Sequence, residues 1–293
     1  MDNGNEIRDF LVSRRAKITP EQAGLPAYGG NRRVAGLRRE EVALLAGVSI
    51  DYYTRLERGR AHGASDGVLE GIARALQLDE AERAHLFDLV RAAAPAGPRA
   101  PRRPATQQVR PSVQRILDSM AMTPAYVRNA RMDILAANRL GAALFAPVLS
   151  SPARPVNNAR FLFLDPAARE FYVDWERQAQ DVVAMLRTEA GRSPHDKALS
   201  NLIGELSTRS ENFRTWWAAH NVRFHRTGVK RFHHPAVGDL TLTYEALDLA
   251  ADEGLRISAY SAEPGTPSDD ALKLLASWAA TLDEAGHSAD PAL

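Results

Sequence analysis

The sequence predicts an all-α domain at the N-terminus and an α+β domain with an antiparallel sheet at the C-terminus. Three observations lead to this prediction. Apolar residues recur at helical spacing up to residue 93, and a segment rich in Pro and Arg follows them. Apolar residues then alternate with polar ones in short runs near residues 240 and 255. The 293 residues are enough for two domains with a core each.

The N-terminal third is predicted to consist of helices joined by loops. Thr19 and Gln22 form a capping-box pattern with Pro20 at the first helical position, which indicates a helix start. Asp79 and Glu82 form a second cap pattern. A loop is expected over residues 24–36 because they contain Pro26 and several glycines. The other expected helices cover residues 6–16, 37–46, 49–58, 68–76 and 79–93.

The C-terminal segment mixes helices and strands. Residues 165–166 predict the start of one long helix with Phe171, Trp175 and Leu186 on one face. Further helices are expected from residues 193 and 210 and over residues 268–284. Strands are expected over residues 131–136, 240–244 and 255–259. Because the strands gather late, after most of the helices, an antiparallel sheet is favoured over a parallel one.

The composition places four segments along the chain. We expect a helical domain over residues 1–92, a Pro/Arg-rich linker over 93–111, a second domain over 112–285 and a disordered tail over 286–293. The chain has no cysteine, which excludes disulfides and thiolate metal sites. No apolar run is long enough to span a membrane, and the polar N-terminus is not a secretory signal. A cytoplasmic protein with no membrane partner is therefore expected.

Charge is unevenly distributed along the chain. The net charge is only +1, yet residues 8–60 contain eleven Lys or Arg against six Asp or Glu. A local positive charge suits a module that meets phosphate, although chance alone gives similar fluctuations.

Residues 39–58, REEVALLAGVSIDYYTRLER, satisfy the steric rules for two short helices packed at a steep angle. Val42, Tyr53 and Leu56 are expected to face a shared core, together with Ala46 and Val48. Ala43 must be small where the second helix passes, and Gly47 must adopt a positive φ in the turn. An ordinary helical hairpin also needs a Gly turn and apolar faces, but the full set at this spacing favours a DNA-binding unit.

The motif VALLAGVS at 42–49, followed by YTRLERG at 53–59, resembles the Cro/C1-type, or XRE, helix-turn-helix of transcriptional regulators. The longer run RRVAGLRREEVALLAGVSIDYYTRLERGR resembles the branch of that family that carries an MmyB-like ligand-binding domain. This resemblance implies that residues 49–58 form a recognition helix in the major groove. The same resemblance implies that Glu57 pairs with Arg14 or Arg15; the alternative is a solvated residue near the helix end. The outward positions expected to meet bases are Ser49, Ile50, Asp51, Tyr52, Thr54 and Arg55.

Arginines give the strongest expected contacts with DNA. Arg55 suits a bidentate contact with guanine, while Asp51 either accepts from cytosine or orients Arg55. Arg33, Arg38 and Arg39 lie before and at the start of the first helix of the motif, where phosphate contacts are expected. The alternative for each arginine is a solvated surface charge.

The C-terminal segment contains no pattern of catalytic residues, so an enzyme is not expected. His220, His225, His233 and His234 match no usual spacing of metal ligands, so hydrogen-bonded or surface histidines are expected, without a metal or cofactor. The aromatic residues between 161 and 217 indicate either core packing or an apolar cavity.

The motifs TPAYV at 123–127, FLFLDP at 161–166, HP at 234–235 and EPG at 263–265 resemble the MmyB-like ligand-binding domain. The resemblance spans most of residues 112–276 and implies a PAS-like fold that binds a fatty acid or a similar small molecule. Arg187 and His220 are expected to meet a ligand carboxylate, with Tyr126 and Asn138 as neutral donors. The alternative for Arg187 is a surface ion pair. The expected ligand-binding residues are Tyr126, Asn138, Phe161, Phe163, Trp175, Arg187, Phe213, Trp217 and His220.

These observations together predict a DNA-binding transcriptional regulator that forms a homodimer and binds a double-stranded DNA operator. A small apolar ligand such as a fatty acid is expected to change its operator affinity. Two alternatives stay open: a second domain that serves only for dimerisation, and a bifunctional enzyme and regulator.

Overall fold

The computed structural model describes residues 3–26, 34–93, 108–223 and 226–288. The chain forms two compact units. The first contains Met1–Pro101, Val183–Ser207 and Arg214–Phe224, and the second contains Arg102–Val182, Thr208–Phe213 and His225–Leu293. Among the described residues, none of the helices combines the length and apolarity that crossing a membrane requires.

The first unit is helical, as the sequence predicts. Its elements are α1 (Asn3–Lys17), α2 (Arg39–Ala46), α3 (Ile50–Glu57), α4 (Asp66–Ala75) and α5 (Glu80–Ala93), with parts of α11 (Trp175–Arg192), α12 (Lys197–Arg209) and α13 (Glu211–Ala218). Ile7, Phe10 and Leu11 of α1 are fully buried, which confirms the apolar face predicted for this helix. The core also contains buried side chains from α2 to α5.

Caps fix the ends of these helices. Asp79 and Glu82 bond reciprocally to each other's backbone N–H groups, at 2.8 and 3.2 Å, which confirms the second cap pattern. Thr19 and Gln22 form the first capping box as well, but only a turn follows, because Gly24 adopts a φ of 72°. α2 and α4 pack closely, since a Cβ added at Gly71 would lie 2.6 Å from a backbone carbonyl oxygen of α2.

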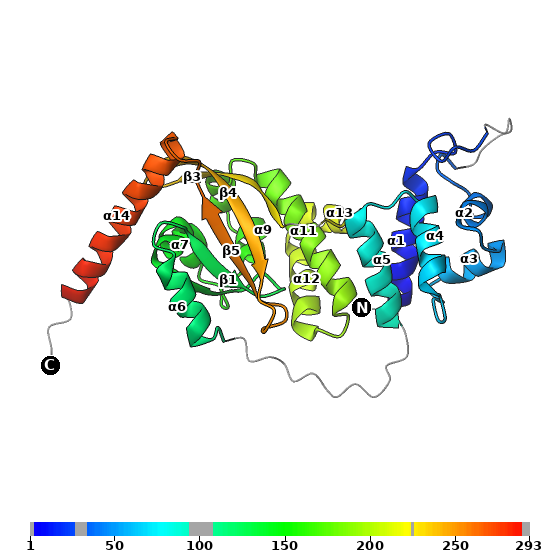
Figure 1. The fold of residues 1–293 in the computed structure, drawn as a ribbon, viewed down its shortest axis with the longest axis horizontal. Coiled ribbons are helices and arrows are strands. Elements are labelled where there is room, and N and C mark those ends of the chain that lie inside the picture. The colour runs from blue at the N-terminus through cyan, green and yellow to red at the C-terminus, as the bar shows by residue number, and fades with distance from the viewer. Residues whose placement is uncertain (1–2, 27–33, 94–107, 224–225, 289–293) are drawn as a thin grey trace. The chain divides into compact units, whose positions relative to one another are not determined.

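The second unit contains a five-stranded antiparallel sheet and covering helices, which confirms the α+β class (Figure 1). The strand order is β2 (Ile134–Ala137), β1 (Ala125–Arg128), β5 (Arg256–Ser261), β4 (Gly238–Asp248) and β3 (Thr227–His234). Sequence reasoning found three of these strands and missed β1 and β3. β1 is short and buried at every position, so it lacks the expected alternation. β3 carries polar residues on both faces.

The two faces of the sheet differ in their packing. On one face, Val127 and Ile257 pack with Val113 and Leu117 of α6 (Pro111–Ser119). The opposite face, called the inner face below, carries aromatic residues of β1, β3, β4 and β5. The ring of Phe232 lies 5.8 Å from that of Phe145 and 5.2 Å from that of Phe171, measured between centroids.

The helices of this unit are α7 (Arg139–Leu144), α8 (Ala146–Leu149), α9 (Asn158–Leu164), α10 (Ala167–Phe171) and α14 (Pro267–Ser288), besides α6 and parts of α11 to α13.

The long helix predicted from residues 165–166 is wrong, because the chain forms α10 and α11 with a break between them. Tyr172 has extended backbone angles and forms a bridge with Phe232 of β3. The N–H of Val173 donates to the carbonyl of Arg231 at 3.1 Å. Pairing with a strand distant in sequence therefore interrupts a segment whose local pattern is helical.

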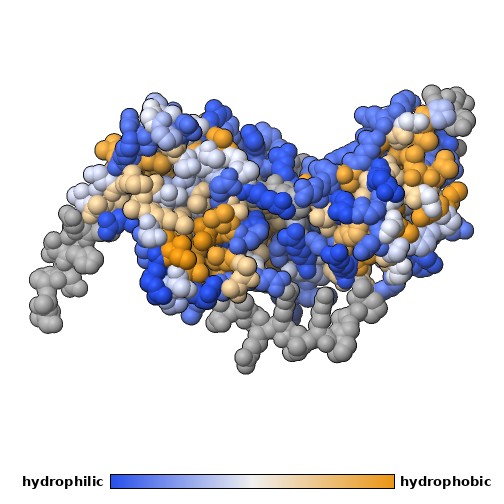
Figure 2. All heavy atoms as spheres, viewed as in Figure 1, coloured by the Kyte–Doolittle hydropathy of each residue, from blue (hydrophilic) through white to orange (hydrophobic). Residues whose placement is uncertain are grey.

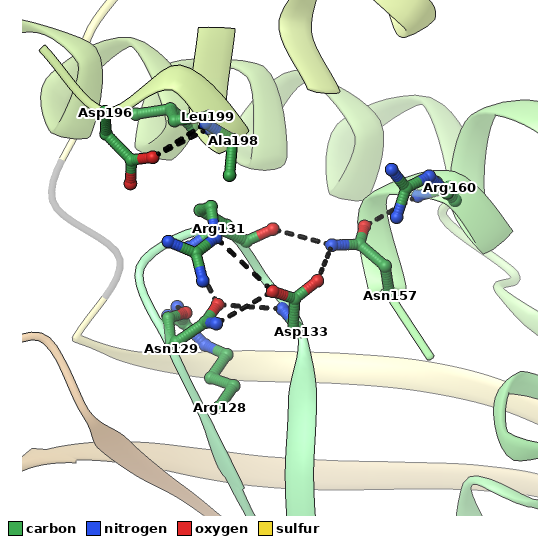
Figure 3. A network of polar contacts seen from close by, with 9 residues as sticks. All are labelled: Arg128, Asn129, Arg131, Asp133, Asn157, Arg160, Asp196, Ala198 and Leu199. Atoms are coloured by element: carbon green, nitrogen blue, oxygen red, sulfur yellow. Dashed lines mark hydrogen bonds and ion pairs between the residues drawn. The ribbon is translucent and has the colours of Figure 1, made fainter. Parts of the chain in front are cut away.

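The next helix also begins later than predicted. α12 starts at Lys197 rather than near residue 193. The carboxylate of Asp196 accepts hydrogen bonds from the backbone N–H groups of Ala198 and Leu199 at 2.9 and 3.1 Å (Figure 3). Asp196 is thus the N-cap that the sequence analysis did not identify. Ser210 caps α13 as predicted, with its hydroxyl accepting from the N–H of Phe213.

A polar corner joins the turn between β1 and β2 to the start of α9 (Figure 3). The amide of Asn129 donates to Asp133 at 2.8 Å, and the amide of Asn157 donates to the other oxygen of Asp133 at 2.7 Å. Asn157 also caps α9 by accepting from the N–H of Arg160. Asn129, Asp133 and Asn157 are all buried, so these bonds satisfy polar groups that would otherwise be costly to bury.

Candidate functional site

The helix-turn-helix consists of α2, a turn at Gly47–Ser49, and α3. Val42, Tyr53 and Leu56 are buried in its core, and Ala43 is 1% exposed, which confirms the predicted inward positions. Ala46 and Val48 are partly buried against the same core. Gly47 has a φ of 69°, and a Cβ there would meet nothing within 4 Å. Glycine is therefore required here by the backbone conformation and not by a lack of space for a side chain.

The N-terminus of α3 is fixed by Ser49, whose hydroxyl accepts from the N–H of Tyr52 at 3.1 Å. Ile50, Asp51 and Arg55 are exposed along α3, and Tyr52 and Thr54 are half-buried. The guanidinium of Arg55 lies 5.1 Å from the centroid of the Tyr52 ring. All six base-contact candidates thus lie on or beside the solvent-facing side of the helix.

Exposed apolar side chains also occur in the helix-turn-helix region. Val34, Leu44 and Ile50 are 43, 73 and 52% exposed. Figure 2 shows apolar surface over the region of α2 and α3, at the right of the view. Apolar groups at a groove-facing position suit contact with thymine methyl groups.

The buried carboxylate of Glu57 connects the helix-turn-helix to α1. Glu57 is 1% exposed, accepts from Nε of Arg15 at 2.8 Å and bonds to Arg39 as well. The expected pairing of Glu57 with the first helix is confirmed, with Arg15 as the partner. The hydroxyl of Tyr53 lies 3.3 Å from Glu57, and burial raises the pKa of this tyrosine. Glu57 is therefore a structural residue and not a DNA contact.

The three phosphate candidates have different surroundings. Arg39 is 46% exposed and shares the carboxylate of Glu57. Arg38 is 44% exposed; its N–H donates to Glu41 at 2.6 Å, and its guanidinium lies 3.5 Å from Glu40. Arg33 lies outside the described residues. Arg38 and Arg39 thus place two accessible positive charges at the N-terminus of α2, where the helix dipole also favours an anion.

The expected ligand-binding residues fall into separate groups. Tyr126 and Phe161 are buried in the aromatic side of the second unit. Phe163 contacts Trp175 and Phe213, with ring centroids 6.4 and 5.1 Å away. The indole N–H of Trp175 donates to a backbone carbonyl of α9. These five aromatic candidates therefore belong to two clusters of the second unit.

Asn138 is a structural hub. Its side-chain oxygen caps α7 by accepting from Gly141 at 2.7 Å and also accepts from the N–H of Ala125 at 3.0 Å. Its amide donates to three backbone carbonyls between residues 117 and 123. Within the described residues, every polar atom of this side chain is thus already bonded.

Arg187, Trp217 and His220 belong to the first unit. Arg187 is 1% exposed; it donates to Glu6 at 2.8 Å, lies 2.9 Å from Nδ1 of His220 and bonds to the carbonyl of Trp217. Its guanidinium lies 4.0 Å from the centroid of the Trp217 ring. Burial lowers the pKa of Arg187 to about 10, an effect that Glu6 opposes. Burial, followed by the charge of Arg187, lowers the pKa of His220 to about 4.

Two buried cations of the second unit were missed by sequence reasoning. Lys230 of β3 is 8% exposed and Arg128 of β1 is 6% exposed. Lys230 alternates with Phe232 and His234, so the period-two pattern places it on their face of the sheet. That pattern was available in the sequence, but β3 had not been identified.

His233 and His234 have ordinary partners. His234 is buried with Nε2 3.1 Å from the carbonyl of Ala143, and its Nδ1 accepts from Ala236. His233 points the other way along the strand alternation and pairs with Asp239. His225 lies outside the described residues.

Comparisons with known proteins identify both parts of the chain. A family model for the MmyB-like transcription regulator ligand binding domain matches residues 109–275, which is more than half of the sequence. A model for a helix-turn-helix domain matches residues 31–86. A search of curated proteins finds no match. Both matches are to domains of transcription regulators rather than of enzymes. The chain therefore belongs to the MmyB-like transcription regulators, and is a DNA-binding regulator that joins a helix-turn-helix to an MmyB-like ligand-binding domain.

Proposed function

We propose that this regulator reads a double-stranded operator with the exposed side of α3 and that a small apolar ligand, such as a fatty acid, changes its operator affinity. The observation that carries the DNA part is the division of α3 into a buried side, with Tyr53 and Leu56, and an exposed side that ends in Arg55. Such a protein acts in the cytoplasm, where the chromosome of a bacterial cell lies.

The base contacts in this proposal come from Ser49 to Arg55. Arg55 donates two hydrogen bonds to a guanine edge, and its position over the Tyr52 ring restricts its rotamers. Ile50 and Thr54 meet thymine methyls, and Asp51 selects against other bases. Arg33, Arg38 and Arg39 contact phosphates and set the register of the helix in the groove.

The ligand part rests on the matched ligand-binding domain and on its aromatic interior. In the second unit the candidate lining residues are Tyr126, Asn138, Phe161, Phe163, Trp175 and Phe213. Arg187, Trp217 and His220 are separate candidates in the first unit. Aromatic surfaces of this kind suit an apolar molecule with few polar groups.

Coupling between the two activities has a physical route in the first unit. Residues Val183–Ser207 and Arg214–Phe224, which fall inside the ligand-binding match, form one compact unit with α1 to α5. Arg187 bonds to Glu6 of α1, and Arg14 of α1 bonds to the carbonyl of His220. A change in α11 on ligand binding therefore alters the support of the helix that also anchors Glu57 through Arg15. Each ligand state then favours a different operator affinity.

The operator complex is proposed to contain a homodimer. One eight-residue recognition helix offers few base contacts, and two copies on a two-fold operator double them. Sedimentation velocity of the full-length protein, alone and with operator DNA, tests this proposal. A dimer is expected at micromolar concentration, and a protein that stays monomeric when bound to operator DNA would contradict it.

DNA selection with the full-length protein tests the function directly. We expect enrichment of a sequence with two related half-sites about ten base pairs, or a multiple of that, apart. Binding to the selected operator is then measured with and without dodecanoate. Failure to enrich any sequence contradicts the DNA part, and identical affinity with and without bound dodecanoate contradicts the ligand part.

A further inference from the structure

The inner face of the sheet in the second unit buries two cations. Lys230 of β3 is 8% exposed and Arg128 of β1 is 6% exposed. Only one buried carboxylate, that of Asp181, influences Lys230 within the described part of the chain. Burying a lysine ammonium is costly unless an anion compensates it.

Strand register places tyrosines beside these cations. Tyr244 pairs with Tyr260 across β4 and β5, and Tyr126 pairs with Ser258 across β1 and β5. Lys230 lies 4.7 Å from the centroid of the Tyr244 ring and 5.8 Å from that of Tyr260. Because residues opposite each other share a face, the lysine and the three tyrosines lie on one side of the sheet.

The ammonium of Lys230 lies against two aromatic rings. Within the residues that the structure describes, it forms no hydrogen bond or ion pair, and only the faces of the two rings approach it. Burial, followed by the charge of Arg128, lowers the pKa of Lys230 to about 7, while the charge of Asp181 opposes the shift. The described part of the protein therefore offers no acceptor to the three donors of this ammonium.

Hydroxyl groups near the lysine are also underused. Among the described residues, the hydroxyls of Tyr126 and Tyr260 make only a long contact of 3.5 Å with each other. Tyr172, by contrast, donates to Asn158 at 2.9 Å and has its partner. The ring of Phe145 contacts both Tyr126 and Tyr260, with centroids 4.8 and 5.2 Å away. Polar donors are thus grouped at one place in an otherwise aromatic interior.

We propose that Lys230, helped by the hydroxyls of Tyr126 and Tyr260 and by the positive charge of Arg128, binds the carboxylate of an apolar monoanionic ligand. The proposal rests on the proposed ligand-responsive function and names the polar end of its site. It assigns the carboxylate to the inner face rather than to Arg187, whose guanidinium is already engaged by Glu6. The surrounding rings of Phe145 and Phe232 contact the apolar remainder of the molecule.

Matched ligands and one charge-removing variant test this assignment. Isothermal titration of the full-length protein compares dodecanoate with dodecanol, and 4-phenylbutanoate with 4-phenylbutanol, so that chain-like and aromatic ligands are separate arms. We expect at least one acid to bind the wild type about tenfold or more tightly than its alcohol, since a charged hydrogen bond is lost in the alcohol. Lys230→Met is expected to remove this preference while it leaves the affinity for the alcohol within about threefold.

Controls separate the possible failures. Lys273→Met removes an exposed lysine of α14 in the same unit and should leave both affinities unchanged. Lys230→Gln is a second neutral variant of similar length, and thermal melting shows whether each variant is folded. An acid preference that survives in both folded Lys230 variants overturns the carboxylate site but leaves the ligand-responsive function intact. Absence of binding by all four ligands to the wild type overturns the ligand-responsive function as well.

Discussion

Arg187→Met should loosen the attachment of α1 to the end of α11 and to α13. The substitution keeps an apolar stem of similar length but removes the bonds to Glu6, His220 and the carbonyl of Trp217. Removing one member of a buried ion pair typically costs about 3–5 kcal/mol. Glu6 is 21% exposed and can be partly rehydrated, and the burial that lowers the pKa of Arg187 to about 10 is itself a cost that the variant relieves. We therefore expect a net loss of about 2–4 kcal/mol.

Hydrogen exchange read by mass spectrometry locates this loss in the intact protein, because it reports the opening of each segment separately. Peptides from α1 and α13 should lose protection by about 30- to 1000-fold, because 1.4 kcal/mol corresponds to a factor of ten. Peptides from the sheet should keep theirs. Arg192→Met on the same helix is the matched control. Arg192 also forms an ion pair, with Asp88 at 2.9 Å, but its side chain is 45% exposed. Surface pairs contribute at most about 1 kcal/mol. Equal exchange in the two variants would refute the buried anchoring role of Arg187.

Three further predictions concern the first unit. His85 is 1% exposed, and burial, followed by the charge of neighbouring arginines, lowers its pKa to about 3. The unfolded chain therefore binds more protons than the folded one below about pH 6.5, and stability should fall by about 1.4 kcal/mol per pH unit as the pH drops towards 4. Urea midpoints at pH 7 and 5 should differ less in His85→Phe than in the wild type, and equal differences would contradict this. Gly47→Ala should lower the stability measured by thermal melting by about 1 kcal/mol, because of the positive φ alone. Gly71→Ala should lower it more, because the added Cβ would lie 2.6 Å from a backbone oxygen of α2. The reverse order would be inconsistent with this packing. Glu57→Gln should lower stability by about 2–4 kcal/mol in chemical denaturation because two arginines lose a buried counterion, and a loss below 0.5 kcal/mol would show that the carboxylate is not needed.

The helix-turn-helix could be predicted because its constraints are local. A small residue at Ala43, a positive φ at Gly47 and buried positions at Val42 and Leu56 all lie within one short segment. Helix ends fixed by nearby caps, such as Ser49, were also accessible from the sequence. Such features depend on neighbours within a few residues, so pattern and chemistry agree.

The features that escaped prediction depend on residues far apart in the chain. The break between α10 and α11 follows from the pairing of Tyr172 and Val173 with β3. Similarly, the alternation in β3 shows that Lys230 shares a face with Phe232, but the burial of that face results from helices earlier in the chain. The partner of Arg187 could not be found from sequence, since Glu6 lies 181 residues away.

The central claim is that the exposed side of α3 reads the operator, and Arg55→Ala tests it most directly. Binding of the full-length variant to the selected operator and to a random duplex should show discrimination reduced by about 1–3 kcal/mol. Arg74→Ala, which removes an exposed arginine of α4, should leave the ratio of the two affinities unchanged. A full operator preference in Arg55→Ala would contradict the assigned role of Arg55 and the groove-facing side of α3.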